Sequence, residues 1–178
     1  LVSGERKLIL VGALCRNHPD RSKIEQLSHL IGQLVEANVG LLTEGPNSLG
    51  AEVVNNLPGS DGLNAGEMMS TALDAYFLLH AEMSEDSCAP GLASGVLKSA
   101  PLVVTLNAFK GEVSEYATVI LPVSPFSETA GTFINLEGTP QSFGPVAPTK
   151  GLSRPAWRLI AALGKLFGCT DFEYQSIE

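Results

Sequence analysis

Residues 102–123 have the sequence LVVTLNAFKGEVSEYATVILPV, and this stretch sets the fold class. Two apolar runs, Leu102–Leu106 and Thr118–Val123, each have the length and composition of a buried strand. Between them, Gly111–Ala117 predicts one helical turn. A strand, a helical connection and a second strand form the unit from which parallel sheets are built, so we expect a parallel α/β arrangement here.

The same alternation extends toward the N-terminus. Further strands are predicted at Lys7–Gly12, Val39–Thr43 and Ala75–His80. Helices are predicted at Asp20–Asn38, Leu49–Asn55, Gly66–Leu73 and Ala89–Ser99. Asn64 and Glu67 have the spacing of a capping box at the start of the third of these helices. We therefore predict an α/β fold with a doubly wound, mostly parallel, Rossmann-like or flavodoxin-like sheet of about five strands and helices on both faces.

The character of the chain changes after residue 123. We predict a parallel α/β domain over residues 1–123 and an extended arm over 124–153, which packs on the same domain or on a neighbour. Residues 154–178 are predicted to form a C-terminal helix, over Arg154–Phe167, and a tail. The chain begins at Leu1 rather than Met, and we expect a single domain that is a piece of a larger subunit.

Composition excludes several classes of function. The net charge of −8, without a basic cluster, argues against a nucleic-acid partner. The apolar runs are too short to cross a bilayer and no secretory signal begins the chain, so we expect no direct membrane insertion. The three cysteines share no metal-ligand spacing, which predicts no metal site in this chain and indicates a reducing compartment.

The run ETAGTFINLEGTPQ, residues 128–141, is the main candidate site. Gly131 and Gly138 allow the backbone to approach another surface closely. Short polar side chains suited to recognising the hydrogen-bonding edge of a ligand accompany them: Thr132, Asn135, Glu137 and Gln141. The alternative is that the same groups hold a long loop in place with no ligand present.

A second set of candidates lies at predicted strand ends, where open α/β sheets bind ligands: Gly12, His80 and Glu82. His80 and Glu82 alternatively form a polar strand end that faces solvent or a neighbouring domain. Gly12 is not followed by the second and third glycines of the dinucleotide fingerprint, and no phosphate-binding loop is present. An unrelated Rossmann-like nucleotide binder therefore stays an alternative without its usual motif.

The segment TVILPVSPFSETAGTFINLEGTPQ resembles the molybdopterin oxidoreductase family, whose members have A-D-V-V-L-P followed by E-x-x-G-T-x-x-N-x-E-G/R-R-x-Q. The matching positions are Val119, Leu121, Pro122, Glu128, Gly131, Thr132, Asn135, Glu137, Gly138 and Gln141. The E-G pair, together with RPAWRLIAALG near the C-terminus, is similar to the large iron–sulfur subunit of NADH:quinone oxidoreductase, respiratory complex I. The resemblance covers roughly residues 6–168.

The resemblance raises the question of whether this chain binds a pterin dinucleotide. In molybdenum enzymes of this family the 128–141 region helps to enclose the pterin dinucleotide. If a pterin is bound, its candidate ligands are therefore Glu128, Gly131, Thr132, Asn135, Glu137, Gly138 and Gln141. Thr139-Pro140 stands where many relatives carry Arg, and losing that Arg removes a bidentate phosphate or pterin donor. We expect no molybdopterin here, and no cofactor in this chain. The family's iron–sulfur clusters are expected in an N-terminal region that precedes it.

The implied role is that of a structural scaffold in the peripheral arm of a proton-pumping NADH:quinone oxidoreductase, without a redox centre of its own. The implied partners are the other subunits of that complex and the remaining domains of the same subunit, at the cytoplasmic face of a bacterial inner (plasma) membrane. The isolated chain is expected to be inactive as an enzyme. The alternative is a domain of a molybdopterin-dependent oxidoreductase of the formate dehydrogenase or nitrate reductase type that helps to bind the pterin dinucleotide.

Overall fold

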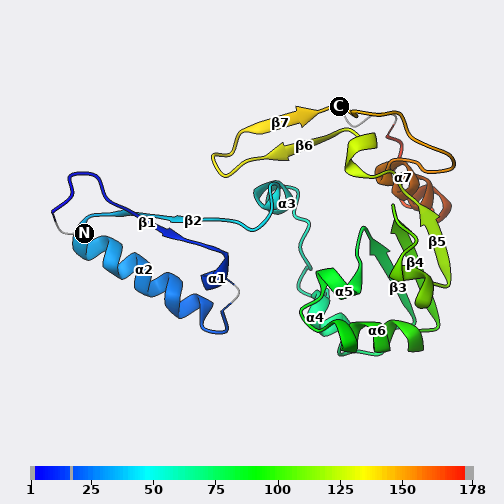
Figure 1. Ribbon diagram of the computed structural model, residues 1–178, viewed down its shortest axis with the longest axis horizontal. Coiled ribbons are helices and arrows are strands. Elements are labelled where there is room, and N and C mark those ends of the chain that lie inside the picture. Colours follow the sequence, from blue (N-terminus) through cyan, green and yellow to red (C-terminus); the bar gives the residue numbers. More distant parts are fainter. Residues whose placement is uncertain (1–2, 17, 175–178) are drawn as a thin grey trace. The chain divides into compact units, whose positions relative to one another are not determined.

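The structure, a computed structural model, describes residues 3–16 and 18–174 (Figure 1). The chain divides into two compact units. The first unit holds Leu1–Leu57 and Thr132–Gln141, and the second holds Pro58–Gly131 and Ser142–Glu178. Each unit has a parallel sheet of its own with helices packed against it.

The first unit is built on a parallel pair of short strands joined by helices. Its elements up to residue 57 are β1 (Leu8–Val11), α1 (Ala13–Arg16), α2 (Arg21–Val35), β2 (Asn38–Leu41) and α3 (Ser48–Val53). The register of the two strands places Leu8 opposite Asn38 and Val11 opposite Leu41. Figure 1 shows α2 running alongside both strands. A helix that joins two parallel neighbours is the crossover expected of an α/β unit.

Helix α2 ends earlier than predicted. Glu36 has a left-handed backbone conformation, with φ of 56°, and its N–H donates to the carbonyl of Gly32. This geometry closes a helix and turns the chain out of it. Asn38, predicted to end the helix, is instead the first residue of β2. The predicted end of the helix was wrong. Glycine usually marks such a left-handed end in a sequence, but here the position is occupied by Glu36.

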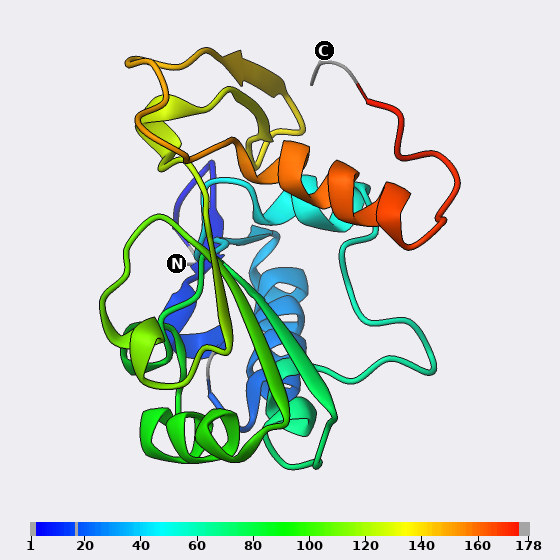
Figure 2. The same cartoon turned by 90° about the vertical axis from the view of Figure 1, so that its right-hand side faces the viewer.

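The second unit is built on three parallel strands in the order β3-β4-β5. Its helices and strands are α4 (Ala65–Met68), β3 (Ala75–Leu79), α5 (Met83–Asp86), α6 (Pro90–Ser99), β4 (Leu102–Asn107), η1 (Glu112–Glu115), β5 (Val119–Pro122), η2 (Phe126–Glu128) and α7 (Ala156–Leu166). Figure 2 shows the three green strands side by side. The alternation predicted from residues 102–123 is confirmed.

The central strand β4 is buried on both faces of this sheet. On one face, Val103 packs in a cluster with Tyr76, Met83, Ala93, Leu97, Val113 and Tyr116. On the other face, Val104 and Leu106 pack with Val123 and with Ala156 and Leu159 of α7. Helices thus cover both faces of the sheet, as a doubly wound arrangement requires, and the continuous apolar run of β4 follows from that.

One polar side chain in this core has no hydrogen-bond partner among the described residues. The Oγ1 atom of Thr105, on β4, is buried and makes no hydrogen bond among the described residues, and the residue is fully buried. We expect Thr105→Val to raise the free energy of unfolding by about 1 kcal/mol, because it removes an unsatisfied hydroxyl at nearly constant shape. Urea unfolding followed by circular dichroism measures the change.

The matched control is Thr118→Val. The Oγ1 atom of Thr118 accepts a hydrogen bond of 3.0 Å from the N–H of Val103, so the same substitution there removes a partner from a buried backbone group. We expect it to lower the free energy of unfolding by about 1 kcal/mol. Equal losses in the two variants would show that the hydroxyl of Thr105 has a partner after all.

The predicted capping box at α4 is confirmed. The side chain of Asn64 accepts a hydrogen bond of 3.0 Å from the N–H of Glu67, and the carboxylate of Glu67 accepts one of 2.8 Å from the N–H of Asn64. The helix that follows ends at Met68, short of the predicted Leu73. Residues 69–74 instead lead directly into β3, so the capping signal located the start of the helix but not its end.

The α/β class and the parallel pairing of five strands are confirmed, whereas their union in one sheet is not. β1 and β2 form one sheet, and β3, β4 and β5 form another. The connection from β2 to β3 holds only the short helices α3 and α4, and the chain passes along it from the first unit into the second. It lacks the single long helix that packs a crossover onto a sheet.

The predicted arm, 124–153, contains regular structure that its sequence pattern did not predict. It holds η2 and the paired strands β6 (Gly131–Ile134) and β7 (Pro140–Phe143). Helix α7 lies inside the predicted Arg154–Phe167, as expected. The predicted domain limits at residues 123 and 153 follow the character of the sequence, and they stay predictions.

Candidate functional site

Most of the run 128–141 folds as a β-hairpin. Figure 1 shows β6 and β7 side by side, joined by a tight turn. The side-chain oxygen of Asn135 accepts hydrogen bonds from the N–H groups of Glu137, at 3.0 Å, and Thr139, at 2.9 Å. Gly138 has a φ of 79°, which favours glycine, and its N–H donates to the carbonyl of Asn135. Asn135 and Gly138 therefore build the turn.

Two more residues of the run, Glu128 and Gly131, make contacts with the chain that follows β6. A carboxylate oxygen of Glu128 accepts a hydrogen bond of 3.2 Å from the N–H of Lys150, which fastens the loop that follows β7. Gly131 lies against the ring of Phe143, and a Cβ atom there would come within 2.6 Å of that ring. Glu128 and Gly131 therefore also stabilise the fold. The side chains of the remaining three, Thr132, Glu137 and Gln141, are exposed.

A cavity of about 580 Å³ lies in the first unit, beyond the carboxyl end of β2. It is lined by Thr43, Glu44, Gly45, Pro46, Phe133, Ile134, Asn135, Leu136, Glu137 and Gln141. The side-chain oxygen of Asn47 accepts a hydrogen bond of 2.8 Å from the N–H of Ile134, which fixes the β2–α3 loop to β6. Ligands of open α/β sheets bind beyond the carboxyl ends of the strands, so this cavity is the candidate binding site.

The structure thereby brings together three of the predicted site residues, Asn135, Glu137 and Gln141. The loop 43–46, which lies opposite them, was not predicted as part of a site. Its one signal is its position directly after a predicted strand. Gly12, at the end of β1, does not line this cavity; its carbonyl accepts hydrogen bonds from Cys15 and Arg16 and so opens α1.

The charge of this cavity limits what it can bind. Its lining, among the residues that the structure describes, contains the carboxylates of Glu44 and Glu137 and no Lys, Arg or His. The side-chain oxygen of Asn135 already accepts two backbone hydrogen bonds. Two carboxylates repel an anion and favour a cation or a hydrogen-bond donor. The cavity is therefore poorly suited to a pyrophosphate group.

The other candidates, His80 and Glu82, follow β3, and each contacts a residue at the carboxyl end of β4. Asn107, which is 5% exposed, donates a hydrogen bond of 3.4 Å to the carboxylate of Glu82. His80 has a left-handed backbone, with φ of 49°, and its N–H donates to the carbonyl of Leu106. Partial burial lowers the pKa of the His80 imidazole, which favours its neutral form. Asn107 was not predicted as a member of this group.

A neighbouring carboxylate, Glu112, is occupied by structural hydrogen bonds. It accepts from the N–H of Ser84, at 3.0 Å, and from the hydroxyl of Tyr116, at 3.3 Å. The hydrogen bonds with Ser84 lower the pKa of Glu112, while burial and then the charge of Glu112 raise the pKa of Tyr116 to about 12. At neutral pH both groups hold fixed protonation states, so they join η1 to α5 rather than transfer protons.

The described part of the chain contains no candidate metal site. No group of three His, Cys, Asp or Glu side chains there has the geometry to hold a metal ion. Cys88 and Cys169 are exposed and Cys15 is half-buried, and all three are free thiols. In residues 3–16 and 18–174, no helix is long and apolar enough to cross a membrane.

The turn can be tested by itself. We expect Asn135→Ala to destabilise the hairpin by about 1 kcal/mol, because the N–H groups of Glu137 and Thr139 lose their acceptor. Asn135→Asp keeps an oxygen acceptor at the same place and is the control. Hydrogen exchange of these two amides measures the effect: faster exchange is expected in the alanine variant alone, and unchanged exchange in both would contradict the assignment.

Comparison with known proteins identifies the family. The model of the molybdopterin oxidoreductase family matches residues 2–166, which is most of the chain. The chain belongs to the molybdopterin oxidoreductase family. The resemblance inferred from residues 118–141 is confirmed.

The relatives include a nitrate reductase catalytic subunit and G subunits of NADH-quinone oxidoreductase. The chain is 30% identical over 122 residues to the assimilatory nitrate reductase catalytic subunit of Bacillus subtilis, with 66% of this chain and 17% of that protein covered. It is 37% identical over 92 residues to the G subunit of NADH-quinone oxidoreductase from Streptomyces coelicolor (49% and 11% covered). It is 26% identical over 139 residues to the same subunit from Salmonella typhimurium (75% and 15% covered). The chain therefore spans less than a fifth of each of these relatives.

Proposed function

We propose that the chain is a domain of the large iron–sulfur subunit of a proton-pumping NADH:quinone oxidoreductase. In this role it is a scaffold domain of the peripheral arm without a redox centre of its own. The observation that carries the proposal is the charge of the cavity beside the hairpin, whose described lining includes Glu44 and Glu137 but no Lys, Arg or His. The similarity to the G subunits of two bacterial NADH-quinone oxidoreductases supports the choice of branch.

The residues do not fit the pterin dinucleotide that the family name implies. A pyrophosphate needs cations or several unpaired N–H donors aimed at it. The hairpin turn uses the N–H groups of Glu137, Gly138 and Thr139 internally. Position 139–140 offers Thr and Pro rather than an arginine. The proposed domain therefore holds no molybdopterin.

The proposal has consequences for partners and place. The iron–sulfur clusters belong to a cysteine-bearing region of the same subunit outside this chain. The partners are that region, the other domains of the subunit and the other subunits of the complex. The assembled protein is then peripheral to the cytoplasmic face of the plasma membrane. By itself the chain oxidises no NADH.

Affinity purification of the tagged full-length protein from its own host tests this proposal. We expect the other subunits of NADH:quinone oxidoreductase to co-purify in constant ratio, and the preparation to reduce quinone with NADH. Mass spectrometry identifies the subunits. Recovery of the protein without them, and without NADH-dependent activity, would contradict the proposal.

A second candidate function rests on one observation. The nitrate reductase catalytic subunit of Bacillus subtilis is 30% identical over two thirds of this chain. On that basis the chain would be a domain of a molybdopterin-dependent oxidoreductase, with the hairpin of β6 and β7 near the pterin dinucleotide. The carboxylates of the cavity beside the hairpin disfavour this candidate function. Molybdenum and pterin analysis of the full-length protein distinguishes the two candidate functions.

A further inference from the structure

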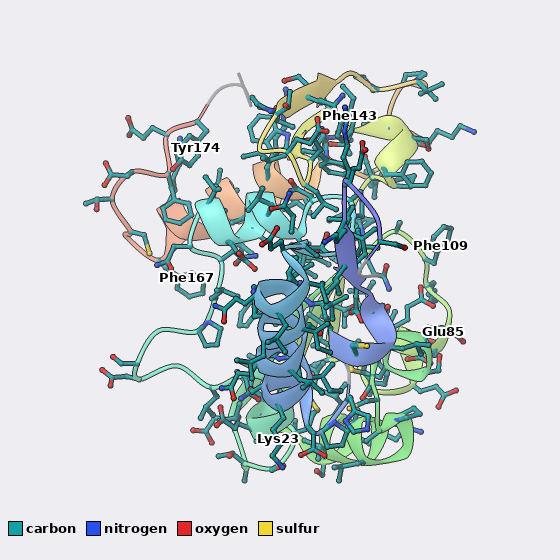
Figure 3. All side chains as sticks on the ribbon, turned by 90° about the vertical axis from the view of Figure 1, so that its left-hand side faces the viewer. Lys23, Glu85, Phe109, Phe143, Phe167 and Tyr174 are labelled. Carbon is teal, nitrogen blue, oxygen red and sulfur yellow. The ribbon has the colours of Figure 1, made fainter. Side chains whose placement is uncertain are left out.

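A small cavity on α7 differs in chemistry from the cavity beside the hairpin. Its volume is about 220 Å³, and it is lined by Trp157, Arg158, Ala161, Ala162, Lys165 and Tyr174, all in the second unit. The guanidinium of Arg158 lies 5.1 Å from the centre of the Trp157 ring. Figure 3 shows Tyr174 on the segment that follows α7. Two cations and two aromatic rings thus share one depression.

The charge around this cavity runs against that of the whole chain. The net charge is −8, yet the described lining contains Arg158 and Lys165 and no carboxylate. Residues 138–170 contain four Lys or Arg and no Asp or Glu; Asp171 and Glu173 follow in the segment that carries Tyr174. Neither Arg158 nor Lys165 forms an ion pair with any carboxylate in the part of the chain that the structure describes. An acidic group of another molecule would therefore meet no competing ion pair at these two cations among the described residues.

The spacing of the two cations favours a peptide over a single small anion. Arg158 and Lys165 are seven residues apart on one helix, so they lie on the same side at about 10 Å along the axis. In an extended chain of the polyproline-II type, which has three residues per turn and a rise of about 3.1 Å per residue, carboxylates three residues apart lie on the same side at about 9 Å. A guanidinium stacked on an aromatic ring keeps its N–H edge available for a bidentate contact with a carboxylate.

We propose that this cavity docks an acidic, extended segment of a partner protein, with one carboxylate on Arg158 and a second on Lys165. Trp157 and Tyr174 pack against the apolar part of the segment, as aromatic residues do at interfaces. The inference stands on the cavity alone and does not depend on the parent complex.

The only tryptophan of the chain, Trp157, provides the test. Tryptophan fluorescence of the chain is titrated with an acetylated hexaglutamate peptide and, at matched ionic strength, with sodium phosphate. We expect a saturable change with the peptide and none with phosphate. Anisotropy of a fluorescein-labelled peptide then gives affinities for the variants, and circular dichroism checks that each variant is folded.

We expect Arg158→Gln and Lys165→Gln each to weaken peptide binding by about three- to five-fold, the effect of one exposed ion pair. Lys150→Gln is the matched control, since it removes the same charge from the same basic segment outside the cavity, and it should change binding little. Equal weakening in all three variants would show non-specific attraction and overturn the proposal. Saturable phosphate binding that competes with the peptide would overturn it in favour of a small-anion site.

Discussion

Leu97→Ala is expected to lower the free energy of unfolding by about 3 kcal/mol, the cost of removing a large buried side chain from a close-packed core. Leu97 is 1% exposed and packs from α6 onto Val103 and the rest of the cluster on that face of the β3–β4–β5 sheet. The cavity that alanine leaves has rigid walls, because the backbone of β4 pairs with strands on both sides. Urea unfolding followed by circular dichroism measures the loss.

Leu92→Ala is the control on the same helix. Leu92 is 55% exposed, so its truncation removes little buried surface and should change the stability by less than about 0.5 kcal/mol. If the two variants lost the same stability, α6 would not be packed on the sheet through the face that Leu97 occupies. The placement of Leu97 in the core beside Val103 would then be wrong.

Gly32→Val is expected to destabilise the first unit by about 2–3 kcal/mol through overpacking. A Cβ atom at Gly32 would come within 2.6 Å of the side chain of Val39 and 3.0 Å of the carbonyl of Ala37. The second of these is backbone, held where the chain turns from α2 into β2, and Ala37 itself donates to the carbonyl of Gly32. The added side chain must therefore push α2 away from β2.

Gly95→Val on α6 is the control for helix propensity. A Cβ atom at Gly95 meets nothing within 4 Å, so valine there has space and should leave the stability nearly unchanged. Hydrogen exchange of the α2 amides locates the effect of Gly32→Val in the first unit. Similar losses at both positions would contradict the close packing of α2 on β2.

The parallel strands were predictable because their signals are local. β4 and β5 are continuous apolar runs, and the capping box of Asn64 and Glu67 is a spacing that can be recognised along the chain. The division of the strands into two sheets was not predictable, because the apolar runs show where strands lie but not which strands pair. The hairpin of β6 and β7 was missed because Pro140 and the exposed residues of β7 hide the alternation typical of strands.

The candidate site was only partly predictable. The run 128–141 was recognised from its residues, yet sequence does not show which polar groups the fold itself uses. The amide side chain of Asn135 could hydrogen-bond a ligand, but its oxygen already accepts two hydrogen bonds within the hairpin turn. The acidity of the cavity arises when Glu44 and Glu137, 93 positions apart by their numbers, line the same depression. That combination exists only in three dimensions.

In the proposed function, this member of the family holds its fold without the pterin dinucleotide. Molybdenum and pterin analysis of the full-length protein, purified from its own host grown with molybdate, tests it most directly. A molybdopterin enzyme purified from the same cells serves as the positive control. We predict that the protein contains neither molybdenum nor pterin in stoichiometric amount. One molybdenum and its pterin per polypeptide would contradict the account.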